Sequence, residues 1–146
     1  MPKIVVPEGG AEYLLSWLLK PASSTFAQLT LGLFVNDYTP VWDSELTDFV
    51  EASGSWYSSE TVDPDTWAVA PGDDSNVYGT YDTEFQWTSD TGTGTVFGYF
   101  LYEPNTGQLI WCQRFDTPIT LQVGREIKIR PKLALWSRCI PICTGE

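Results

Sequence analysis

The segment that decides the fold runs from Thr95 to Phe115 and reads TVFGYFLYEPNTGQLIWCQRF. Two runs rich in β-branched and aromatic residues, 95–102 and 108–115, flank a short turn that contains Pro104, Asn105 and Gly107. Proline presets φ, asparagine tolerates left-handed geometry, and glycine adopts a positive φ without strain. The segment therefore predicts a β-hairpin.

Both faces of this hairpin are apolar, which indicates its place in the sheet. In the first run Phe97, Tyr99 and Leu101 fall on one face, whereas Phe100 and Tyr102 fall on the other. A strand pair with two apolar faces needs cover on both sides. We therefore expect the central pair of an antiparallel sandwich, with its second face covered by a neighbouring layer or by another subunit.

Most of the remaining chain also favours strands. Residues 26–35 alternate apolar with polar or small residues, and residues 127–135 alternate isoleucine and leucine with lysine and arginine. Pro131 lies in the second run, which indicates an edge strand or a bulge there. Shorter strands are expected at 56–61, 66–70, 83–88 and 120–123, and a helical turn or irregular crossing at 43–52.

One helix is expected at residues 11–20, where Pro21 would end it. Gly9 and Gly10 precede it and would let this arm hinge. The helix could cover the open end of the sandwich, or it could dock on a partner as an amphipathic arm through Tyr13 and Trp17.

Together these patterns predict an all-β fold, an antiparallel β-sandwich with one short N-terminal helix. A chain of 146 residues fits one such domain. We divide it into an N-terminal arm at 1–25, a sandwich at 26–136 and a C-terminal tail at 137–146.

The composition argues against several classes of function. The chain has a formal net charge of −11 and no histidine. This charge repels bare nucleic acid and disfavours membrane surfaces. Without histidine, no Ser/His/Asp triad, Cys/His dyad or histidine metal site can form. Two carboxylates could act as a small glycosidase, but the sequence does not place any pair at the required separation. We therefore expect no enzyme and no cofactor.

Metal ligands and thiols give weak signals. The acidic segments 63–65 and 73–76 are rich in oxygen ligands but do not follow the calcium-loop pattern, so solvated loops are the better interpretation and calcium is the alternative. Cys112, Cys139 and Cys143 form no metal-binding spacing and are expected as free thiols. No segment has the length and apolarity of a secretory or membrane-spanning helix, so we expect synthesis in the cytosol.

Charge is divided unevenly along the chain. Fifteen of the nineteen acidic residues lie between Asp37 and Asp116, whereas six of the eight basic residues lie between Arg114 and Arg138. Lys128, Arg130 and Lys132 share one face of the predicted strand. A basic edge strand is often a guard against aggregation. The functional alternative is a contact with an acidic protein surface, either a second copy of the chain or a host lattice.

Aromatic residues are abundant in the acidic middle of the chain. The sequence has seven Trp, seven Tyr and seven Phe, more than one small core needs, which favours a protein that binds partners. Trp56, Tyr57, Trp67 and Trp87 could fill the core, form a subunit interface or stack on sugars.

Two blocks of the sequence resemble small virion proteins of tailed bacteriophages. The first is LGLFVNDYTP at 31–40, followed by DFVEA at 48–52. The second runs from GYF at 98–100 through TGQLIW at 106–111 to Phe115. They are motifs of strand and turn that cover about a third of the chain. The acidic, tryptophan-rich middle and the cysteine-bearing tail have no counterpart in that pattern.

The resemblance implies a head decoration, or cement, protein with a β-sandwich of the jelly-roll type. Such a protein binds the capsid exterior as a homotrimer and stabilises the shell. Its partners would be the major capsid protein and further copies of itself, and it would reside on the virion after synthesis in the host cytoplasm. We expect the capsid or partner contact at Tyr13, Trp17, Lys128, Arg130 and Lys132. The alternative is a receptor-binding or carbohydrate-binding module of the tail that uses Trp56, Tyr57, Trp67 and Trp87.

Overall fold

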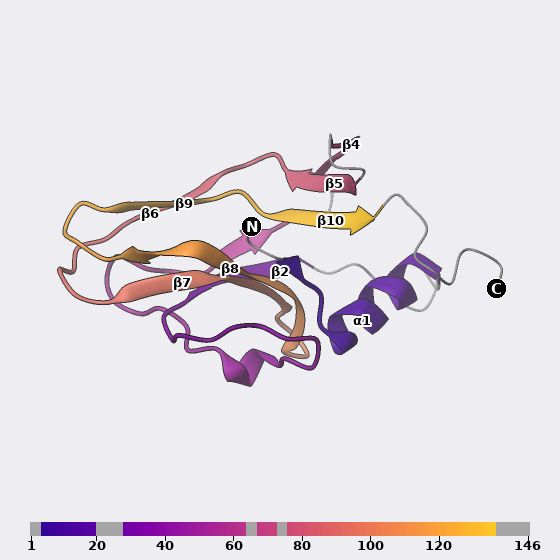
Figure 1. The fold of residues 1–146 in the computed structure, drawn as a ribbon, viewed down its shortest axis with the longest axis horizontal. Coiled ribbons are helices and arrows are strands. Elements are labelled where there is room, and N and C mark those ends of the chain that lie inside the picture. Colours follow the sequence, from indigo (N-terminus) through magenta and orange to yellow (C-terminus); the bar gives the residue numbers. More distant parts are fainter. Residues whose placement is uncertain (1–3, 20–27, 64–66, 73–75, 137–146) are drawn as a thin grey trace. The chain divides into compact units, whose positions relative to one another are not determined.

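The computed structural model describes residues 4–19, 28–63, 67–72 and 76–136 (Figure 1). In this part of the chain the fold is all-β and sandwich-like, with antiparallel sheets and one short helix, which confirms the predicted class. The jelly-roll strand order stays a prediction. The chain divides into two compact units. Unit 1 comprises residues 1–64 and 86–127, and unit 2 comprises residues 65–85 and 128–146.

Unit 1 is built on a five-stranded sheet in the order β1-β8-β7-β2-β3. The predicted hairpin forms β7 and β8, which occupy interior positions of this sheet, so the expected central pair is confirmed (Figure 1). The five strands are β1 (Ile4–Val5), β2 (Leu29–Phe34), β3 (Glu60–Val62), β7 (Thr95–Glu103) and β8 (Gln108–Thr120).

Aromatic packing fixes the centre of this sheet. Phe34 of β2 and Phe100 of β7 are fully buried, and Phe49 packs against both rings at centroid distances of 4.9 and 5.3 Å. Leu109 and Cys112 of β8 complete the cluster. Burial of such rings supplies most of the hydrophobic stabilisation of a small domain. Both faces of the hairpin are therefore covered within the subunit.

The helix α1 spans Glu8–Leu19 and begins earlier than predicted. The hinge expected at Gly9 and Gly10 is wrong, because both residues lie inside the helix. Gly10 is buried against β8, and a Cβ atom there would come within 2.1 Å of the Ile110 carbonyl oxygen. Glycine at this position lets the helix approach the sheet closely. A 3₁₀ turn at Leu46–Asp48 lies in the segment 43–52, where a helical turn or irregular crossing was predicted.

The strands β6 (Phe85–Thr88) and β9 (Glu126–Ile129) pair with each other and form a two-stranded ribbon. Trp87 of β6 is only 4% exposed, and its indole N–H donates to the Ser58 carbonyl at 2.8 Å. Ile127 of β9 is fully buried. The alternation predicted for residues 127–135 is thus present, but the run is interrupted at Arg130 and Pro131 rather than forming one strand.

Unit 2 contains a three-stranded antiparallel sheet in the order β10-β5-β4. Its strands are β4 (Trp67–Pro71), β5 (Asn76–Tyr81) and β10 (Lys132–Trp136). Tyr81 forms the small core of this unit, where its ring stacks on Phe85 at 5.5 Å and meets the edge of Trp67 at 5.2 Å. Sequence patterns did not predict β5.

Candidate functional site

The basic residues of the predicted edge strand, Lys128, Arg130 and Lys132, here called the basic strip, lie at exposed positions. Lys128, Arg130 and Lys132 are exposed and alternate with three buried residues. The Lys132 ammonium lies 3.8 Å from the centre of the Tyr78 ring on β5, a cation–π contact that holds the charge over the sheet of unit 2. The strip therefore presents positive charge to solvent in a molecule whose net charge is −11.

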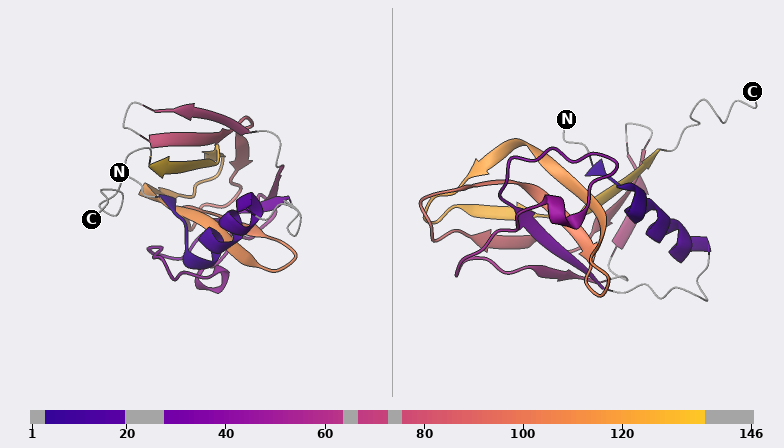
Figure 2. Two further views of the ribbon diagram at one scale, coloured as in Figure 1. Left: turned by 90° about the vertical axis from the view of Figure 1, so that its right-hand side faces the viewer. Right: turned by 90° about the horizontal axis from the view of Figure 1, so that it is seen from below.

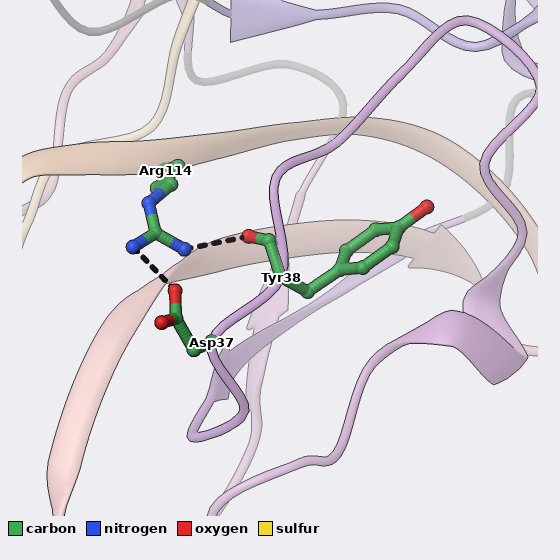
Figure 3. A network of polar contacts seen from close by, with 3 residues as sticks. All are labelled: Asp37, Tyr38 and Arg114. Carbon is green, nitrogen blue, oxygen red and sulfur yellow. Dashed lines mark hydrogen bonds and ion pairs between the residues drawn. The ribbon is translucent and has the colours of Figure 1, made fainter.

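Arg114, in contrast, is engaged within unit 1 (Figure 3). One guanidinium nitrogen contacts the Asp37 carboxylate at 2.6 Å, and another donates to the Tyr38 carbonyl at 3.0 Å. The guanidinium carbon also lies 5.1 Å from the centre of the Phe97 ring. These contacts connect the turn after β2 to β8. Arg114 therefore stabilises unit 1 and is not part of the basic strip.

The expected partner-binding arm is packed on its own chain. Tyr13 is half-buried, and α1 lies against β8 within unit 1 (Figure 1). Leu15 on the same helix is exposed. The side chain of Trp17 lies outside the described residues. The structure therefore favours the interpretation of α1 as a cover for the sheet at its N-terminal turns.

Three of the four singled-out aromatic residues lie together in unit 1. Trp56, Tyr57 and Trp87 form a row with centroid distances of 5.6 and 6.2 Å. The Tyr57 hydroxyl donates to the Glu51 carboxylate at 2.6 Å and accepts from the Leu33 N–H at 3.2 Å. Burial and the Glu51 bond raise the pKa of Tyr57 well above its ordinary value. Trp87 is thus buried and Tyr57 half-buried, whereas Trp67 belongs to unit 2.

Trp56, the remaining member of the row, lines a groove of about 350 Å³ in unit 1. Its indole ring lies beside Gly54. Short polar side chains line the groove with it, namely Ser53, Ser55, Asp90, Thr91 and Thr93. The Ser55 hydroxyl donates to the Asp90 carboxylate, and both residues line the groove. An aromatic ring beside hydroxyl and carboxylate groups is chemistry that suits a sugar.

A second groove, of about 360 Å³, was not predicted. It is bounded by Trp42 to Thr47, the first residues of α1 and the turn of the β7–β8 hairpin. Trp42 and its neighbour Val41 are 64% and 50% exposed. Three carboxylates, those of Glu8, Asp43 and Glu45, belong to the same groove. The only sequence signal was a tryptophan placed between Pro40 and Asp43, outside any periodic run.

The described residues offer little reactive chemistry. They contain no group of three or more His, Cys, Asp or Glu side chains that could hold a metal ion. Cys112 is buried, and burial raises the pKa of its thiol to about 12, which makes it a poor nucleophile. Cys139, Cys143 and most of the two acidic loops considered for calcium lie outside the described residues.

No helix in the described ranges has the length and apolarity to cross a membrane. No protein-family model matches the chain, and no curated protein matches it either.

Proposed function

We propose that this chain is a structural protein of a bacteriophage virion, a head decoration protein that binds the capsid exterior and stabilises the shell. The antiparallel all-β fold and the two blocks that resemble small phage virion proteins support this proposal. Binding to the assembled shell alone would stabilise it by mass action.

The observation that carries the proposal is the exposed pair Val41 and Trp42 beside the acid-lined groove. Tryptophan is prominent among the residues that dominate binding energy at protein interfaces. The backbone supports this loop, because the Glu8 N–H donates to the Trp42 carbonyl at 2.7 Å. The main chain at Trp42 is therefore tied to the start of α1.

Co-sedimentation with expanded capsids of the phage that encodes the chain tests this role. We expect saturable binding of the wild type, and we expect Trp42→Ala to weaken it by roughly 2 kcal/mol, or about thirtyfold. Val123→Ala is the matched control, since Val123 is 75% exposed elsewhere in unit 1. Absence of saturable binding, or equal affinities for the two variants, would contradict the proposal.

A second candidate function, carbohydrate binding by a tail-associated module, is favoured by the Trp56 groove. Here the indole ring would stack on a sugar face while Ser55, Asp90 and Thr93 meet its hydroxyls. A glycan array compares the wild type with Trp56→Ala and Trp42→Ala. A sugar signal that only Trp56→Ala removes would support this function, whereas a silent array with intact capsid binding would exclude it.

A further inference from the structure

The strand β4 is an edge of the sheet in unit 2, and it ends at Pro71. Its five residues, Trp67–Pro71, carry no charge, and the residues from Ala68 to Pro71 are exposed, with Val69 at 73%. Among the described residues β4 pairs only with β5. Natural edge strands are usually protected by lysine, proline, bulges or covering loops, because a bare edge pairs readily with another chain. In β4 only the last residue, Pro71, is of this kind. An uncharged, exposed edge therefore points to strand addition.

The opposite edge of the same sheet is β10, and it is basic. Figure 2 shows β5 between β4 and β10. Both outer strands are antiparallel to β5, so they run in the same direction. Lys132 opens β10 and Arg130 precedes it by two residues, and both are exposed. The sheet therefore has one neutral edge and one positive edge.

The charges next to β4 in the sequence complement those of β10. Asp63 and Asp65 precede β4, and Asp73 and Asp74 follow it. Elsewhere two copies of a chain with net charge −11 repel each other. Attraction between the acidic residues next to β4 in the sequence and the basic residues at the start of β10 would offset this repulsion.

We propose that β4 of one copy pairs with β10 of the next, in parallel, so that the sheets of unit 2 become continuous from copy to copy. In parallel pairing the beginning of β4, which Asp63 precedes in the sequence, faces the beginning of β10, which Arg130 precedes. Pairing of β4 with β4 would bring acidic flanks of both copies together, which is unfavourable. Because the two surfaces differ, the contact is heterologous and generates a ring or a filament. A homotrimer is one such ring. This inference goes beyond the proposed function and needs no capsid.

Sedimentation velocity over a concentration series tests the contact with the protein alone. We expect the wild type to self-associate with a dissociation constant on the order of 10 µM, since a five-residue edge buries little surface. Val69→Lys and Arg130→Glu should each sediment as monomers. Val123→Lys and Arg125→Glu are matched controls at exposed positions and should associate like the wild type. Circular dichroism checks the fold, and Ala70→Lys replaces Val69→Lys if that variant misfolds.

Mixing the two monomeric variants decides the geometry. Val69→Lys keeps an intact β10 and Arg130→Glu keeps an intact β4, so an equimolar mixture should form a dimer with one copy of each. A monomeric wild type would overturn the proposal. Association of the Val69→Lys variant would also overturn the proposal. If Val69→Lys abolishes association but Arg130→Glu does not, the proposal is likewise wrong, and the copies pair through β4 and β4.

Discussion

The five-stranded sheet of unit 1 and the three-stranded sheet of unit 2 use similar short apolar strands in opposite ways. In the five-stranded sheet of unit 1, five of the six residues of β2 are buried. In the three-stranded sheet of unit 2, four of the five residues of β4 are exposed. Both strands are uncharged, so composition alone does not separate them.

The difference lies in what surrounds each strand. β2 is flanked by β3 and β7, and the rings of Phe49 and Phe100 cover Phe34. β4 has a neighbour on one side only, and its apolar side chains meet solvent. The first sheet therefore provides stability, and we interpret the second as a surface for assembly. The predictions below test whether stability and association separate in this way.

Truncation of a core ring should have the largest effect on stability. Phe100 is 1% exposed and packs on Phe49, so Phe100→Ala removes a buried ring and leaves a cavity in unit 1. We expect a loss of about 3–5 kcal/mol in the free energy of unfolding. Val69→Ala on β4 should change it by less than about 0.5 kcal/mol. Urea unfolding measures both, and similar losses for the two variants would refute the assignment of the core to unit 1.

A pair of glycines gives a finer comparison of the two sheets. A Cβ atom at Gly98 of β7 would lie 2.1 Å from the Gln113 carbonyl oxygen and 2.6 Å from the Phe34 ring. Gly98→Ala should therefore cost about 1–3 kcal/mol through overpacking. A Cβ atom at Gly79 of β5 meets nothing closer than Trp67 at 3.8 Å.

Gly79→Ala should consequently be neutral or slightly stabilising. Thermal unfolding of the two alanine variants provides the measurement. A loss at Gly79 that equals the loss at Gly98 would show that the sheet of unit 2 is as tightly packed as that of unit 1.

The smallest of the three effects concerns the turn of the hairpin and depends on pH. Glu103 is buried, which by itself raises the pKa of its carboxyl, but hydrogen bonds from Thr106 and Asn105 outweigh burial and lower that pKa below 4.5. A lowered folded-state pKa contributes stability that is present above pH 4.5 and is lost as pH falls through the folded-state value.

Glu103→Gln should therefore cost about 1 kcal/mol at neutral pH, a modest value because the turn is at the surface. The difference from the wild type should shrink in acid. Denaturant unfolding at pH 7 and at pH 3 tests this expectation. A difference that is constant with pH would mean that the charge of Glu103 contributes nothing to the turn.

The hairpin and its place in the sheet could be predicted because the information is local. Turn formers between two apolar runs specify the reversal, and apolar residues on both faces specify an interior position. The alternation after Glu126 similarly placed Ile127 and Ile129 inside. Gly107, with φ of 73°, adopts the left-handed geometry that the turn chemistry indicated.

Other features depend on contacts that a sequence does not reveal. Gly10 resembled a hinge, but its lack of a side chain serves close packing against Ile110. β5 was missed because Asn76 and Gly79 weaken its pattern and its partners come from both earlier and later in the chain. The exposure of Trp42 and the burial of Trp87 follow from tertiary packing, since tryptophan serves equally in cores and at interfaces.

Hydrogen exchange at low and at high protein concentration tests the separation of the two sheets most directly. Exchange reports the opening of each segment, and association protects only the segments that form the contact. We predict that amides of β4 and β10 exchange more slowly at high concentration, while those of β2, β7 and β8 remain equally protected at both. Exchange in β4 and β10 that does not depend on concentration would contradict the assignment of unit 2 to assembly.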